Sequence, residues 1–260
     1  MTTQPTIAAV SRDQQRSLRR SNAAAALLHA AQAAVVLVLA TGFALPVTAS
    51  YLQGPPGTAP QEPVVLFDLP TGVAVAAFLG LSALAHLLVC TAWWRRYLGD
   101  LAQHRNPARW VEYAFSSSLM IVLIAQLVGI SDVAALVAVF GVNAAMILFG
   151  WLQEHYEEPG GGGWLPFAFG CLAGIVPWIA IVLYVVAPGS ASPVSPPAFV
   201  YGIIVSLFVF FNIFAFNQWL QYRARGRWRD YLFGEKVYIL LSLTAKSLLA
   251  WQVFAGTLAG

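Results

Sequence analysis

Seven long apolar stretches, separated by short polar ones, dominate the hydropathy pattern of the chain. Each is long enough, at about 18 or more mostly apolar residues, to cross a membrane as a helix. The pattern therefore predicts an all-α membrane protein, a bundle of seven transmembrane helices. The expected spans are 21–44, 70–95, 107–130, 132–154, 164–187, 198–222 and 235–257.

The connections between these spans are short, with one exception. The third and fourth spans are separated only by Ser131 and Asp132, which must form a tight turn. The long first connection holds SYLQGPPG and PVVLFDLP, with aromatic and β-branched residues on either side of a proline and glycine turn. This arrangement predicts a short external β-hairpin between the first two helices. The proline-rich APGSASPVSPP after the fifth span needs no fold of its own.

The chain is expected to form one domain, residues 21–257, after an N-terminal segment, residues 1–20. The first apolar stretch runs from Ala23 to Leu45 and follows several arginines, as in a signal peptide. It is longer than the apolar region of a cleaved signal, about 7 to 15 residues, so we interpret it as a retained helix.

Composition supports a membrane protein. Hydrophobic residues make up 59% of the chain and charged residues 10%, against about 45 to 50% and about 25% in soluble domains. The pI of about 9.0 does not indicate nucleic-acid binding, because the basic residues flank apolar spans in short groups. Cys90 and Cys171 both fall within apolar stretches, which favours buried thiols over a disulfide.

The positions of the basic residues predict the orientation in the membrane. The connections after the first, third and fifth spans and the C-terminal end contain no lysine or arginine. Basic residues instead gather at the other ends of the spans: Arg12, Arg16, Arg19 and Arg20; Arg95, Arg96, Arg105 and Arg109; and Arg223, Arg225, Arg227, Arg229 and Lys236. By the positive-inside rule, this multi-pass protein of the cell membrane has a cytoplasmic N-terminus and an external C-terminus.

Lys246 lies within the last apolar stretch, LSLTAKSLLAWQVFAGTLAG, with no acidic residue within ten positions on either side. A charged, unpaired amine in hydrocarbon costs several kcal/mol, so an intramembrane lysine predicts a functional site. It follows Lys236 by ten positions, which places it about 15 Å from the cytoplasmic end. A structural ion pair is the alternative interpretation.

Three other ionisable residues are expected at similar depth in the same half of the bundle. His29 and His86 each lie nine residues from an arginine, or about 13 Å deep, and Glu112 lies about 10 Å deep. Each histidine could simply be a hydrogen-bonded packing residue, and Glu112 could lie at the interface or pair with Arg109. Their shared depth strengthens the functional interpretation.

A lysine at this depth has two chemically distinct uses. It can form an ion or substrate site with Glu112, or it can form a Schiff base with an aldehyde, whose positive charge then needs a carboxylate. Aromatic residues on the last three spans would suit a flat conjugated ligand, although ordinary packing and interfacial belts also explain them. These residues are Trp178, Phe208, Phe211, Phe214 and Trp251.

Over essentially its whole length the chain resembles the heliorhodopsins, a family of retinal-binding rhodopsins. The most specific stretches are RWVEYAFSSSLMIVLIAQ (109–126), FGVNAAMILFGWLQE (140–154), GIVPW (174–178) and SLTAKS (242–247). The family also keeps its N-terminus inside, unlike other microbial rhodopsins, and this agrees with the orientation deduced from the arginines.

The resemblance implies roles for individual residues. Lys246 would bind all-trans retinal as a protonated Schiff base, and Glu112 would be its counter-ion. Ser242 stands where ion-pumping rhodopsins usually keep a second carboxylate. His29 and His86 resemble the histidines beside the cytoplasmic polar cavity of the family. Further pocket positions by resemblance are Ser117, Asn143, Met146, Phe211 and Gln218.

The sequence favours a light sensor over a proton pump, and predicts no enzyme. Pump-type relatives carry a donor carboxylate eleven residues after the counter-ion, where this chain has Leu123, and the outer half offers only Asp132. A light-driven proton transporter, or a small transporter without retinal that uses the Lys246 and Glu112 pair, is the alternative. The expected partners are the lipid bilayer, a second copy in a homodimer, and an unknown cytoplasmic signalling partner docking on QEHYEEPGGGG or RARGRWRD.

Overall fold

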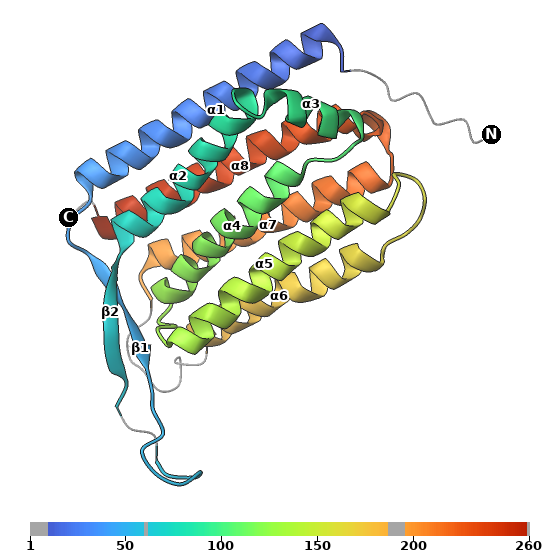
Figure 1. The fold of residues 1–260 in the computed structure, drawn as a ribbon. Coiled ribbons are helices and arrows are strands. Elements are labelled where there is room, and N and C mark those ends of the chain that lie inside the picture. Colours follow the sequence, from blue (N-terminus) through green and yellow to red (C-terminus); the bar gives the residue numbers. More distant parts are fainter. Residues whose placement is uncertain (1–9, 60–61, 187–195, 259–260) are drawn as a thin grey trace.

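Seven long helices lie side by side in the computed structural model, which describes residues 10–59, 62–186 and 196–258 (Figure 1). All seven are long and apolar enough to cross a membrane, which confirms the predicted fold class. They are α1 (Arg12–Leu39), α2 (Thr71–Cys90), α4 (Pro107–Leu127), α5 (Val133–Tyr156), α6 (Leu165–Val186), α7 (Ala198–Tyr222) and α8 (Tyr231–Val253). A 3-10 turn, η2 (Gly226–Arg229), precedes α8, and a π-helical turn, η3 (Phe254–Leu258), follows it.

The first predicted span, 21–44, is wrong at both ends. α1 begins at Arg12 because Ser11 forms a capping box with Gln14, in which each side chain accepts a hydrogen bond from the other residue's backbone amide. The helix ends at Leu39, and residues from Ala44 join a β-strand. A hydropathy profile detects the apolar part of a helix, but it does not detect a polar first turn that is stabilised by an N-cap residue.

The second predicted span, 70–95, extends beyond its helix and into the start of a second one. α2 ends at Cys90, whose carbonyl oxygen accepts a hydrogen bond of 3.0 Å from Arg19 Nε. A short helix, α3 (Trp94–Ala102), then buries Tyr97 and Leu101 and leaves Arg95 exposed. This amphipathic pattern is typical of a helix that lies along an interface.

The predicted hairpin is present. Strands β1 (Ala44–Ala49) and β2 (Val64–Pro70) pair antiparallel. Thr48 on β1 donates its amide to the Ser131 carbonyl oxygen at 2.8 Å, so the hairpin is tied to the α4–α5 turn. Asp132 Oδ1 caps α5 by accepting the amides of Ala134 and Ala135. The tight turn at Ser131 and Asp132 is therefore confirmed.

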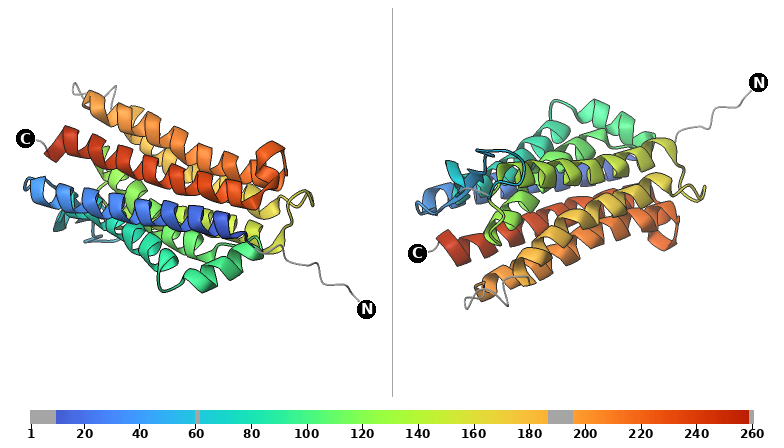
Figure 2. Two further views of the ribbon diagram at one scale, coloured as in Figure 1. Left: turned by 90° about the horizontal axis from the view of Figure 1, so that it is seen from above. Right: turned by 90° about the horizontal axis from the view of Figure 1, so that it is seen from below.

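The two ends of the bundle differ (Figures 1 and 2). At one end, the basic end, lie the start of α1, α3 and the α7–α8 connection. At the other, the hairpin end, lie β1, β2 and the α4–α5 turn. The proline-rich connection after α6 falls mostly in residues 187–195, outside the described residues.

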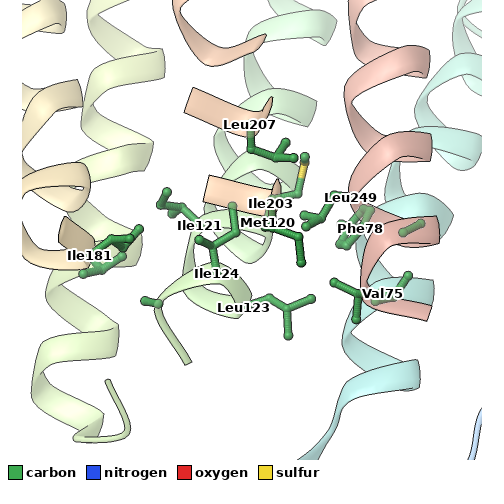
Figure 3. Packing of buried hydrophobic residues seen from close by; sticks show 14 of the residues in the cluster. Val75, Phe78, Met120, Ile121, Leu123, Ile124, Ile181, Ile203, Leu207 and Leu249 are labelled. Atoms are coloured by element: carbon green, nitrogen blue, oxygen red, sulfur yellow. The ribbon is translucent and has the colours of Figure 1, made fainter. Parts of the chain in front are cut away.

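α4 is the most buried of the seven helices. The half of α4 nearer the hairpin end buries Met120, Ile121 and Ile124 in an apolar core. Side chains from α2, α6, α7 and α8 complete this core (Figure 3). The outer faces of the bundle are apolar and exposed, as expected of a surface against lipid. Both cysteines are free, but only Cys90 is buried; the prediction of a buried Cys171 is wrong, because it lies on the exposed face of α6.

Candidate functional site

Lys246 and Glu112 meet inside the bundle. Lys246 Nζ on α8 lies 3.2 Å from Glu112 Oε1 on α4, and the two side chains are only 4% and 6% exposed. Each side chain compensates the charge of the other, which would be unfavourable if it were alone in the hydrocarbon core. The partner of Lys246 is therefore Glu112, and the interpretation of Glu112 as an interfacial residue paired with Arg109 is wrong.

Two serines complete the hydrogen bonding of the pair. Lys246 Nζ donates to Ser242 Oγ at 2.6 Å, one helical turn earlier on α8. Ser82 on α2, which is fully buried, donates to Glu112 Oε1 at 2.5 Å. The ring of Tyr113 lies with its centre 4.9 Å from Lys246 Nζ, close enough for a cation–π contact. Three helices thus fix the pair.

A cavity of about 400 Å³ opens beside Lys246. Ser117, Met146, Phe211 and Ser242 line it. Asn143 stands behind this wall and donates to Ser117 Oγ at 2.8 Å. Met146 reaches the cavity because α6 has a glycine opposite: a Cβ at Gly174 would lie 2.5 Å from the Met146 sulfur.

A second cavity, of about 820 Å³ including its open mouth, adjoins the first. Both are bounded by Tyr113, Met146, Ile147, Phe211 and Phe214. The second extends to Trp178 and Gln218, and Trp178 meets the rings of Phe208 and Phe211 edge-on, with centres 5.3 and 5.5 Å apart. Trp251 is not part of these walls: it is 39% exposed and contacts Phe254.

Together the two cavities suit a long, flat, apolar molecule that ends at Lys246. Eight of the 23 residues that line the two cavities are aromatic, and the only amine among the lining residues is that of Lys246. A conjugated aldehyde such as retinal matches this combination of shape and chemistry.

The two histidines lie next to each other on the basic side of the pair. Their rings stack with centres 5.9 Å apart, His29 from α1 and His86 from α2. His86 Nδ1 donates to Asn22 Oδ1 at 2.8 Å. His86, Asn22 and Glu112 line one small cavity, whereas His29 stands behind His86.

A second buried cluster was missed by the sequence analysis. Arg109 Nη2 lies 2.6 Å from Glu154 Oε1, and Arg109 Nη1 donates to Glu235 Oε1. Its guanidinium lies over the rings of Trp110 and Tyr238, 4.4 and 4.0 Å from their centres. All three charged side chains are at most 5% exposed.

The signal that could have revealed this cluster is weak. Arg109, Glu154 and Glu235 stand at the ends of predicted spans, where charged residues ordinarily face water. Arg109 follows Asn106 and Pro107, an N-cap and first-turn signature that places Arg109 in the first turn of the helix. Nothing in one sequence, however, brings the ends of three helices together.

The fold and the site define a class: a seven-helix membrane protein with a lysine and carboxylate pair at the end of an aromatic cavity, as in the rhodopsins. The model of the heliorhodopsin family matches residues 18–258. The chain therefore belongs to the heliorhodopsin family, which implies a retinal-binding, light-sensing rhodopsin. Comparison with curated proteins found no match.

We predict that Arg109→Met destabilises the protein strongly, by about 3 to 5 kcal/mol, because two buried carboxylates lose their only cation within hydrogen-bond distance. Unfolding in detergent, followed by circular dichroism, measures the loss. Adding Glu154→Gln and Glu235→Gln to Arg109→Met should restore part of the lost stability, because the buried carboxylates are then neutral amides. Arg96→Met is the control, since Arg96 is 81% exposed and such pairs contribute about 0 to 1 kcal/mol. Equal stability of the two single variants would contradict the prediction.

Proposed function

We propose that this protein is a light-sensing photoreceptor in which Lys246 Nζ carries all-trans retinal and Glu112 is the counter-ion. The observation that supports the proposal is the buried pair, 3.2 Å apart, at the closed end of an aromatic cavity. Bound as a protonated Schiff base, retinal supplies the absorption of visible light and a light-driven isomerisation. Residues of the chain supply the counter-charge, the binding contacts and the proton acceptor.

Glu112 would carry the counter-charge largely alone. Ser242, which replaces the second carboxylate of ion-pumping rhodopsins, offers a neutral oxygen 2.6 Å from Lys246 Nζ. The hydrogen bond from Ser82 orients the Glu112 carboxylate and stabilises its negative charge. Ser117, Asn143, Met146, Phe211, Gln218 and Trp178 are the proposed binding residues for the chromophore.

We propose that illumination moves the proton of Lys246 Nζ toward the basic end of the bundle. The small cavity lined by Glu112, His86 and Asn22 lies there. His86 can accept a proton, since its Nε2 is buried with no hydrogen-bond partner among the described residues. In the proposed orientation this end is cytoplasmic, so the proton would be held on the cytoplasmic side.

A light-driven proton pump is less well supported. Vectorial transfer requires groups on both sides of the switch. Leu123, at the position of the donor carboxylate in pumps, is 1% exposed in the apolar core. Met120, Ile124 and Leu249 fill the same region. A transporter without retinal would leave the aromatic cavity and the family membership unexplained.

Two partners are proposed from the family resemblance. One is a second copy of the chain. The β2 strand exposes Val64, Val65, Leu66 and Phe67 on both faces, and an exposed apolar strand favours pairing with another chain. The other is a cytoplasmic signalling protein, for which the α5–α6 and α7–α8 connections are the candidate docking faces.

The protein purified with all-trans retinal should be coloured, and Lys246→Ala should be colourless, because no other amine lines the cavity. Absorption spectra in the visible range measure this. Lys236→Ala, at the basic end of the same helix, is the matched control and should keep the colour. A colourless wild type would contradict the photoreceptor proposal.

Glu112→Gln should shift the visible band to longer wavelength. A weaker counter-ion stabilises the ground state less, because the positive charge of that state is concentrated at Lys246 Nζ. Ser82→Ala, which removes one hydrogen bond and no charge, should produce a smaller shift. An unchanged band in Glu112→Gln would assign the counter-ion role to another residue.

A further inference from the structure

The Arg109 cluster contains more negative than positive charge. One guanidinium lies between the carboxylates of Glu154 and Glu235, all nearly fully buried. If both acids are ionised, one negative charge remains without a partner in a region of low dielectric. Such a charge makes the uptake of one proton favourable.

The hydrogen bonds distinguish the two acids. Glu154 accepts four: from Arg109 Nη2, the Tyr231 hydroxyl, the Asn106 amide and the Trp110 indole, at 2.6 to 2.9 Å. Glu235 accepts two, from Arg109 Nη1 and from Asn106 Nδ2 at 2.7 Å. All four donors of Glu154 are directed at its two carboxylate oxygens. Both oxygens of Glu235 also face donors, but its carboxylate accepts fewer hydrogen bonds than that of Glu154.

Glu235 also faces the light-sensitive site. The small cavity that holds Glu112 and His86 continues to Arg109 and Glu235. Glu154 does not line it. A proton leaving Lys246 Nζ on the basic side therefore meets Glu235 as the carboxylate at the far end of the same cavity.

We propose that Glu235 is the group that takes up the displaced proton and thereby passes the light signal to the basic end of the bundle. The inference rests on the proposed function. In this step the N–H bond at Lys246 Nζ breaks, the proton crosses the cavity by way of His86 or water, and an O–H bond forms on Glu235. The step involves no oxidation or reduction. The opposite charges of Arg109 and Glu154 then compensate each other.

The charged and titratable groups around Glu235 come from several helices. Arg109 faces it from α4 and Glu154 lies across the guanidinium from α5, while Tyr231 and Tyr238 belong to its own helix. Across the cavity are His86, Glu112 and Tyr97. Arg109 is the only permanent cation in this set, so the charge balance of the cluster is set by the two acids.

Protonation of Glu235 would loosen a connection between two helices. A neutral carboxyl group has a hydroxyl to donate, and both of its present partners are donors. Glu235 would have to release Asn106, which caps α4 by accepting the Arg109 amide at 3.1 Å. The N-terminus of α4 would then be held to α8 by one hydrogen bond fewer.

Light-minus-dark infrared spectroscopy on the retinal-loaded protein tests the proton transfer. We expect a carboxyl C=O band that rises as the Schiff-base proton is lost and decays as it returns. The band should be absent in Glu235→Gln, shifted in Glu235→Asp and unchanged in Glu158→Gln, an exposed loop control. The visible absorption of each variant shows separately whether the chromophore is bound. A coloured Glu235→Gln protein with an unchanged band would overturn the inference and leave the proposed function standing.

Amide hydrogen exchange on the retinal-free chain tests the structural consequence. Glu235→Gln imitates the neutral acid, so the first turn of α4 should exchange faster, by about fivefold or more, than in the wild type or in Glu158→Gln. An equal exchange rate in all three would show that Glu235 does not hold this helix end, and would overturn the signalling part of the inference.

Discussion

The structure depends on the compensation of a positive charge placed inside hydrocarbon. Lys246 can be buried at this depth because Glu112 lies 3.2 Å away and Ser242 Oγ accepts a hydrogen bond from its amine. Neither acid nor amine would be tolerated alone. The pair therefore fixes how α8 sits against α4, and it leaves the amine facing an aromatic cavity where a bound aldehyde has a ready counter-charge.

α4 organises the polar interior because it stands at the centre of the bundle. Glu112 and Arg109 are three residues apart on this helix, and each is paired with residues of other helices. The hairpin half of α4 is apolar instead, with Met120, Ile121 and Ile124 in the core. One helix thus divides the molecule into a charged half and an apolar half. In the proposed mechanism, a proton displaced from Lys246 would find its nearest acceptors in the charged half.

Much of this could be predicted from the sequence. The seven spans, the hairpin and the heliorhodopsin fold follow from hydropathy, turn residues and motifs, and the depth estimates brought Glu112 to the level of Lys246. Helix ends set by caps, as at Ser11, and the break after Cys90 could not be predicted, because hydrogen bonds fix them rather than hydropathy. The Arg109 cluster was missed for a related reason: charges at span ends usually face water, and only the packing of α4, α5 and α8 buries these three.

We propose that the distribution of charge makes this protein a sensor that keeps the displaced proton on one side. Illumination of cells that contain the retinal-loaded protein, with the pH of the suspension recorded, tests this claim most directly. The account predicts no sustained change in pH, because apolar side chains such as Leu123 fill the route to the hairpin end. A sustained light-driven change that a protonophore abolishes would contradict it and would identify a pump.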